Sequence, residues 1–200
     1  MAESEDDTSE TPWRAIVGLG NPGERYRQTR HNVGFQVVEE LADRFQLGPG
    51  REECNSRVWV SEHHRLLLVQ PQTFMNRSGY AVRCLAERRS LDGASFLVVY
   101  DEVHLPLGRI RLRPKGSPAG HRGMESVIES LRTSDVSRLR CGVAGGDGTS
   151  PEGEALVDYV LSPFEEKEME AVAEMIRRAA DASEAWMAEG MAAAMNRFNG

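Results

Sequence analysis

The stretch Phe96-Leu97-Val98-Val99-Tyr100-Asp101 decides the fold, because a run of apolar and aromatic residues ends directly in a carboxylate. A continuous apolar run of this kind is typical of a strand buried on both faces in the middle of a largely parallel sheet. Proteins of that class place their chemistry in the loops at the carboxyl ends of the strands. We therefore expect Asp101 to lie where other polar loops of the chain converge.

The rest of the chain fits the same architecture. Strands are predicted over 13–19, 57–60, 65–69, 109–113 and 139–144, and helices over 32–45, 76–89, 122–131 and 165–189. Within 109–113 basic and apolar residues alternate, which predicts a strand with one basic, solvated face. Strands alternating with helices indicate one α/β domain over residues 13–200, a twisted mixed sheet flanked by helices. The acidic segment 1–12 is predicted to be a disordered tail.

The composition of the chain limits where the protein is expected to be located and what it is expected to bind. No apolar run approaches the roughly 20 residues of a membrane span, and an acidic start is no secretory signal. The three cysteines, Cys54, Cys84 and Cys141, are odd in number and form no CxxC pattern, so we expect a reduced, cytoplasmic protein. The net charge of −7 is unfavourable for RNA binding by the chain as a whole. Arginines gather within 109–140, however, and predict a local basic face.

One motif resembles a dinucleotide-binding site but is better explained as a turn. The stretch 18–23, Gly-Leu-Gly-Asn-Pro-Gly, matches GxGxxG letter for letter and follows a predicted strand. Pro22 lies inside the motif, no apolar helical stripe follows it, and no acid ends a second strand at the usual distance. Asn-Pro-Gly is strong turn chemistry, and Asn21 would cap that turn.

The polar residues of the loops fit water activation. His31 stands at the start of a predicted helix, whose N-terminus lowers the pKa of an imidazole and keeps it neutral. An Asp101 hydrogen-bonded to a histidine would fix its tautomer. Asn76 either caps a helix or offers a carboxamide that both donates and accepts. A metal site formed by Asp101 and His104 with His31 or His121 is the alternative, although no paired-ligand spacing supports it.

Taken together, these stretches resemble the bacterial-type peptidyl-tRNA hydrolase family over nearly the whole chain after residue 12. The similarity rests on 18–23 with Tyr26, 29–34, 71–79, 101–108, 120–121 and 138–140. It implies hydrolysis of the ester between a peptide and the 3′ ribose of tRNA, without metal or cofactor, by a cytoplasmic monomer whose partner is peptidyl-tRNA and not a membrane.

The resemblance also implies roles for individual residues. His31 would be the general base and Asp101 its partner, while Asn21 and Asn76 would hold the peptide carbonyl and the water. The substrate contacts would come from Tyr26 and Met75 in the cleft, from His121, and from Arg113 and Arg140 as a clamp on the tRNA 5′ phosphate.

Two departures from the family pattern keep alternatives open. The family usually has Gly-Gly-His-Asn-Gly where this chain has Ala119-Gly120-His121-Arg122-Gly123, and Asp-Leu-Pro where it has His104-Leu105-Pro106. Arg122 and the acidic charge balance make an RNA-binding protein of the same fold that has lost turnover, like plant organelle relatives that assist splicing, the alternative function. The presence of Asn21, His31, Asn76 and Asp101 argues against it. A small-molecule esterase is a third, which the grouped arginines argue against.

Overall fold

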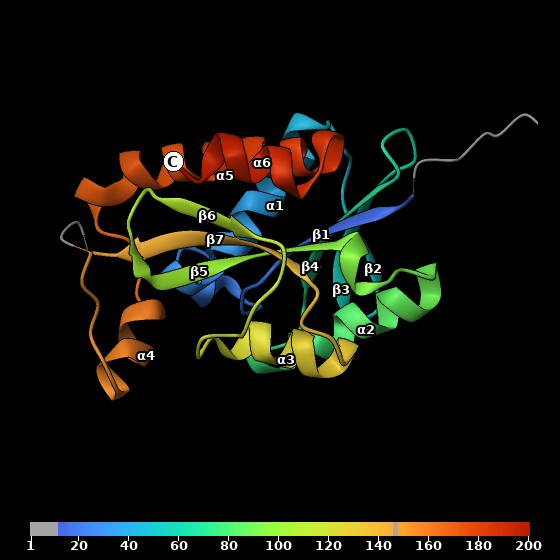
Figure 1. Ribbon diagram of the computed structural model, residues 1–200. Helices are drawn as coiled ribbons and strands as arrows, with labels where there is room; N and C mark the ends of the chain where they lie inside the picture. Colours follow the sequence, from blue (N-terminus) through green and yellow to red (C-terminus); the bar gives the residue numbers. More distant parts are fainter. Residues whose placement is uncertain (1–11, 146–147) are drawn as a thin grey trace, which may run out of the picture.

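The computed structural model describes residues 12–145 and 148–200, and one seven-stranded sheet runs through them (Figure 1). The strand order is β2-β3-β4-β1-β5-β7-β6. The strands are β1 (Arg14–Gly18), β2 (Arg51–Glu53), β3 (Ser56–Ser61), β4 (Leu66–Pro71), β5 (Phe96–Pro106), β6 (Ile110–Arg113) and β7 (Ser137–Ala144). Apart from Pro12, the predicted disordered tail lies outside the described residues.

The predicted central strand is β5. Its first five residues are almost completely buried, and β1 and β7 flank it in parallel orientation. β4 is parallel to β1, whereas β3 and β6 run antiparallel to their neighbours, so the sheet is mixed. The predicted α/β class with a mixed sheet is confirmed. β5 is longer than predicted, because it continues to Pro106 with an irregular register opposite β7 after Glu102.

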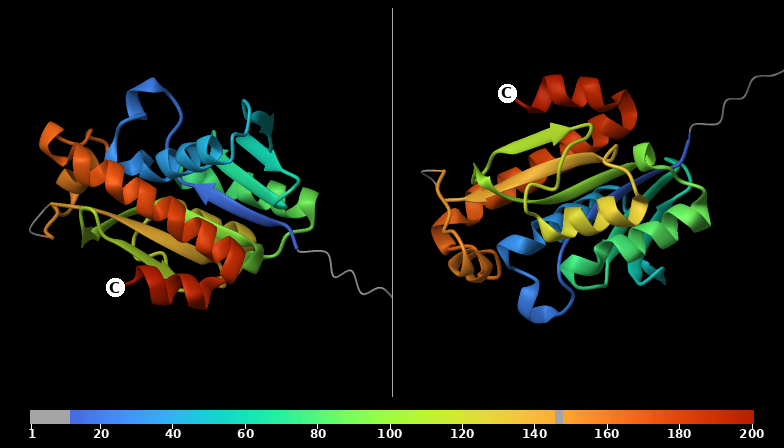
Figure 2. Two further views of the ribbon diagram at one scale, coloured as in Figure 1. Left: turned by 90° about the horizontal axis from the view of Figure 1, so that it is seen from above. Right: turned by 60° about the horizontal axis from the view of Figure 1, so that its bottom comes forward.

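Helices cover both faces of the sheet (Figures 1 and 2). One layer holds α1 (Val33–Arg44), α5 (Met169–Glu189) and α6 (Met191–Phe198), and the other holds α2 (Ser78–Arg89) beside α3 (Arg122–Leu131). The period of two along β5 serves both layers, because Leu97 and Val99 join the core under α1 and α5, whereas Val98 and Tyr100 join the core under α2 and α3. Each layer thus buries its own apolar core against the same strand.

Three elements were not predicted: β2, α4 (Glu154–Val160) and α6. β2 and α4 are short and bury little, so neither carries a readable apolar pattern. α6 is separated from α5 by Gly190, whose φ of 87° ends the long helix and starts another. Among the described residues, no helix is both long enough and apolar enough to cross a membrane.

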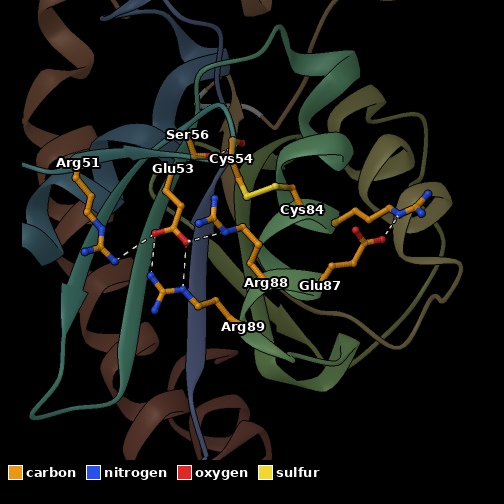
Figure 3. Close-up of a disulfide and its surroundings, with 9 residues drawn as sticks. Arg51, Glu53, Cys54, Ser56, Cys84, Glu87, Arg88 and Arg89 are labelled. Carbon is orange, nitrogen blue, oxygen red and sulfur yellow. Dashed lines mark hydrogen bonds and ion pairs between the residues drawn. A yellow bond between two sulfur atoms is a disulfide. The ribbon is translucent and has the colours of Figure 1, made fainter.

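Cys54 and Cys84 form a disulfide between the β2–β3 turn and the middle of α2 (Figure 3). This corrects the expectation that all three cysteines are reduced. The partners lie 30 residues apart, and only Cys141 is free, buried on β7. Count and spacing could not reveal the pair, because it forms where a turn meets a helix from another part of the chain. Beside it, Glu53 forms an ion pair with Arg89 at 2.8 Å, which ties the same two elements together.

We predict that the disulfide stabilises the fold by about 3 kcal/mol, since it closes a loop of intermediate length and restricts the unfolded chain. Adding dithiothreitol should lower the midpoint of urea unfolding. A variant with both Cys54→Ser and Cys84→Ser should start at the lower midpoint and respond to the reductant no further. An identical midpoint with and without reductant in the unchanged protein would contradict this.

Candidate active site

Asp101 is the centre of the candidate site, at the point where β5 leaves the apolar part of the sheet. Its Oδ1 accepts a hydrogen bond from Nδ1 of His31 at 2.8 Å and another from Nε2 of His121 at 3.0 Å. His31 lies in the 3₁₀ turn Arg30–Asn32 before α1, and His121 is the N-cap residue of α3. The two histidines therefore reach one oxygen of the carboxylate from the starts of two helices that belong to different layers.

The hydrogen bonds fix which nitrogens carry protons. Nδ1 of His121 accepts from the main-chain N–H of Met124 at 3.1 Å, so the proton of this ring is on Nε2 and is donated to Asp101. His31 donates to Asp101 from Nδ1, so in its neutral form Nε2 is unprotonated and able to accept a proton. Both ring nitrogens of His121 are thus engaged within the protein, whereas His31 keeps one for chemistry.

Burial and charge act in opposite directions on this pair. Burial would raise the pKa of Asp101, but the imidazoles of His31 and His121 outweigh it and hold that pKa far below its usual range. Burial would lower the pKa of His31, but the Asp101 carboxylate outweighs it and raises that pKa above the ordinary value. The lowered pKa expected from the helix N-terminus is therefore wrong. α1 begins only at Val33, and a helix dipole typically contributes less than about 1 kcal/mol.

A pair of asparagines shapes the turn after β1. The carboxamide of Asn32 accepts from the main-chain N–H of Asn21 and donates to its carbonyl, both at 2.9 Å. The side-chain Oδ1 of Asn21 in turn accepts from the main-chain N–H of Met75 at 2.8 Å. The polar group that remains to Asn21 is its Nδ2, which can only donate. Asn32, a possible N-cap from the sequence, makes no side-chain cap hydrogen bond to α1 and instead holds the main chain of Asn21 in place.

These groups line a cavity of about 630 Å³ beside α4. Its polar wall includes Asn21, His31, Asn76, Asp101 and His121, and its apolar wall includes Phe74, Met75, Leu156, Val157 and Val160. Asn76 is exposed in the 3₁₀ turn Met75–Arg77 and does not cap α2, whose N-cap residue is Arg77. Of the predicted catalytic and cleft residues, the structure brings all but Tyr26 to this cavity.

Tyr26 lies in the 3₁₀ turn Glu24–Tyr26, away from the cavity wall. The guanidinium of Arg25 lies 4.5 Å from the centre of its ring. The main-chain carbonyl of Tyr26 accepts hydrogen bonds from both the N–H and the hydroxyl of Thr29. In this structure Tyr26 thus supports the turn that leads to His31.

The two predicted phosphate-binding arginines lie on neighbouring strands. In the antiparallel register, Arg140 of β7 stands opposite Arg111 of β6, and Arg138 stands opposite Arg113. Nη1 of Arg140 lies 3.2 Å from Glu102, and its Nε is buried without a hydrogen-bond partner. Arg113 is half-buried. All four side chains share one face of the sheet, because they alternate with buried apolar residues. Arg138 is fully buried and donates to the main-chain carbonyls of Ser117, Ser134 and Val136, so we use the name arginine edge for Arg111, Arg113 and Arg140 only.

Arg30, beside His31, is a residue whose importance the sequence did not reveal. Its guanidinium is almost fully buried, forms a two-point contact with Glu168 at 2.8 and 3.3 Å, and lies between the rings of Tyr159 and Phe164. Its main-chain N–H donates to Ser162 at 3.1 Å. Arg30 therefore anchors the turn that carries His31 to α4, the apolar wall of the cavity, and to the start of α5.

The metal alternative involves a different set from the one expected. His31, Asp101 and His121 each offer a ligand atom within 4.8 Å of the others, whereas His104 is not in the group. Two imidazoles and a carboxylate form a donor set that suits Zn²⁺. Metal ligands must be deprotonated, and both ring nitrogens of His121 are already engaged, so an ion held by all three side chains would first have to displace a hydrogen bond of His121.

Replacing Asp101 with Asn should lower the pKa of His31, because the carboxylate that raises it is removed while burial remains. Titrating the His31 ring by NMR in both proteins checks the direction. The ¹⁵N shifts should also show that the Nδ1–H form of His31 is less favoured in the variant. A pKa of His31 that stays at its wild-type value would show that Asp101 does not control it.

We also predict that Glu168→Ala lowers the free energy of unfolding by about 3 kcal/mol, since it leaves the Arg30 charge buried without its partner. Glu174→Ala is the matched control, because it removes an exposed ion pair to Arg177 and should cost less than about 1 kcal/mol. Chemical unfolding of both variants gives the comparison. Equal losses would mean that the Arg30 contact acts as an ordinary surface pair.

The chain matches the family described as peptidyl-tRNA hydrolase over residues 15–200. It is 45% identical to the peptidyl-tRNA hydrolase of Methylacidiphilum infernorum over 184 residues, which cover 92% of this chain and 96% of that protein. It is 44% identical to the enzyme of that name from Chloroflexus aggregans, over 92% of this chain and 97% of that one. The crystal structure of peptidyl-tRNA hydrolase from Acinetobacter baumannii has the same fold, with a TM-score of 0.86, 29% identity, and coverage of 94% of this chain and 95% of that one. The chain therefore belongs to the peptidyl-tRNA hydrolase family.

Proposed function

We propose that this chain hydrolyses the ester between a peptide and the 3′ ribose of tRNA, with His31 as the general base. The observation that carries this is the hydrogen bond from Nδ1 of His31 to Asp101, which leaves Nε2 of this cavity-lining residue as the nitrogen that can take up a proton. Nε2 takes a proton from water as the water oxygen bonds to the ester carbonyl carbon. The bond from that carbon to the ribose oxygen then breaks, and the proton passes from His31 to the departing oxygen.

The side-chain carboxamides of Asn21 and Asn76 suit two different roles in the reaction. Asn21 can only donate, since its Oδ1 already accepts from Met75, and a positioned donor is what a carbonyl oxygen needs as it becomes negative. Asn76 keeps both its donor and its acceptor and is exposed to the cavity, so it suits the attacking water. His121 has neither ring nitrogen to spare, so its substrate contact is made by the face or edge of its ring.

Binding of the tRNA is assigned to the arginine edge, including Arg113 and Arg140. Guanidinium groups bind phosphate in two-point geometry, and phosphate contacts set the position of a nucleic acid without reading its sequence. Glu102 holds Nη1 of Arg140 at 3.2 Å and so fixes where this guanidinium lies on the arginine edge. The tRNA substrate supports a cytoplasmic location, and we propose that the protein acts as a monomer.

A turnover assay distinguishes hydrolysis from the alternative function, RNA binding without hydrolysis. The relatives are named hydrolases, which does not favour that alternative. We expect release of N-acetylated amino acid from N-acetyl-aminoacyl-tRNA, falling about 10²- to 10⁴-fold with His31→Ala. Filter binding should show that this variant still binds tRNA, with affinity that decreases as salt rises. Release that survives His31→Ala would exclude His31 as the base, and wild-type binding without release would support the alternative.

A further inference from the structure

A second cavity, of about 310 Å³, lies next to the catalytic one and has no part in the chemistry above. Asn21 lines both cavities, so the residue assigned to the carbonyl oxygen borders the second cavity as well. The buried side chains of Phe35 and Gln70 contribute to its floor, and the exposed Arg57 and Gln72 contribute to its rim. We call it the glutamine groove, because Gln36 also lines it.

The three glutamines leave hydrogen-bond acceptors for a ligand. Nε2 of Gln36 donates to a main-chain carbonyl at 3.3 Å, that of Gln70 at 3.0 Å and that of Gln72 at 3.2 Å. Each side chain therefore has its Oε1 left to accept. A fitting ligand must bring N–H or O–H donors. A phosphodiester has only acceptors at neutral pH and does not match.

The charge of the groove agrees with this selection. Glu24 and Glu39 line it together with Arg27 and Arg57, so the carboxylates balance the guanidinium groups. A phosphate backbone is attracted by a surplus of positive charge, which the arginine edge has and the groove lacks. A peptide main chain is neutral and alternates donors with acceptors. Its N–H groups suit the glutamine oxygens, and its carbonyls suit Arg27 and Arg57.

The strand order places the groove on the side of the site opposite the arginine edge. Asp101 lies on β5 and Asn21 follows β1, in the middle of the sheet. The groove draws its strand residues from β3 and β4, whereas the arginine edge belongs to β7 and β6 beyond β5. Peptidyl-tRNA has the same order, with the ester between the peptide and the nucleic acid.

We propose that the glutamine groove binds the main chain of the peptide moiety, in the residues that precede the esterified one. The inference rests on the proposed function and extends it, because it makes substrate affinity depend on peptide length. A substrate with one N-acetylated residue reaches the catalytic cavity alone, whereas a longer peptide continues past Asn21 and donates its N–H groups to Gln36, Gln70 and Gln72.

The test compares two substrates on the same tRNA, an N-acetyl-aminoacyl-tRNA and an N-acetyl-tetrapeptidyl-tRNA with the same esterified residue. Gln36→Leu and Gln72→Ala should each raise KM about three- to tenfold for the tetrapeptide only, as expected for one lost hydrogen bond. Gln72→Trp, which fills the groove, should have a larger effect of the same selectivity. Gln28→Ala is the control, because Gln28 is exposed and lines another cavity.

Equal effects on the two substrates, or none on either, would overturn the proposal. If the wild-type protein released neither substrate, the proposed function would fail, and the groove would be tested by binding alone. In that case N-acetyl-tetrapeptide amide is titrated into the ¹⁵N-labelled protein. Shifts in the side-chain NH₂ signals of Gln36, Gln70 and Gln72 would support a peptide site, and unchanged signals would refute it.

Discussion

The buried carboxylate of Asp101 is the constraint on which the site depends. A charged group with a side chain only 1% exposed is tolerated where hydrogen-bond donors replace water, and two imidazoles do this at one oxygen. His31 comes from the layer of α1 and His121 from the layer of α3, so the charge is satisfied only when both layers are packed on the sheet. The same contact that stabilises the charge sets the tautomer of His31. Packing of both layers on the sheet therefore also orients the ring of His31, the proposed base.

The surrounding residues limit how far His31 can move. Gly34 lets α1 approach the sheet, because a Cβ there would lie 2.4 Å from the carbonyl oxygen of Val99 on β5. Asn32 holds the turn at Asn21, and Arg30 holds the same segment to α4 and α5. Three consecutive residues before α1 therefore have three partners in different parts of the chain. These three contacts hold His31 at a fixed position, and a general base requires a fixed distance to the water that it activates.

Local patterns were sufficient for most of the fold and for part of the site. The continuous apolar run at 96–100 became the buried half of β5, and helical spacing within 32–45 became α1, because in both cases burial follows from neighbouring residues. Arg30 is different, since its burial depends on Glu168, 138 positions later, and a charged residue in a polar motif gives no sign of it. The disulfide between Cys54 and Cys84 was not predicted for the same reason, because its partners come from separate parts of the chain. The raised pKa of His31 required the distance to Asp101, which outweighs the helix effect that the sequence alone suggested.

A net charge of −7 is compatible with a nucleic-acid substrate because the charges are segregated. Acids of α5 are partly neutralised within their own layer, where Asp181 and Glu184 contact Arg44. Positive charge remains at the arginine edge, on one side of Asp101, and the neutral glutamine groove lies on the other. If both proposals hold, free tRNA occupies only the first of these and free peptide only the second. The intact ester joins both halves, so binding of one half raises the effective concentration of the other. Preference for the substrate over either product then follows from the arrangement of the sheet, without any group that recognises the ester itself before it reaches His31.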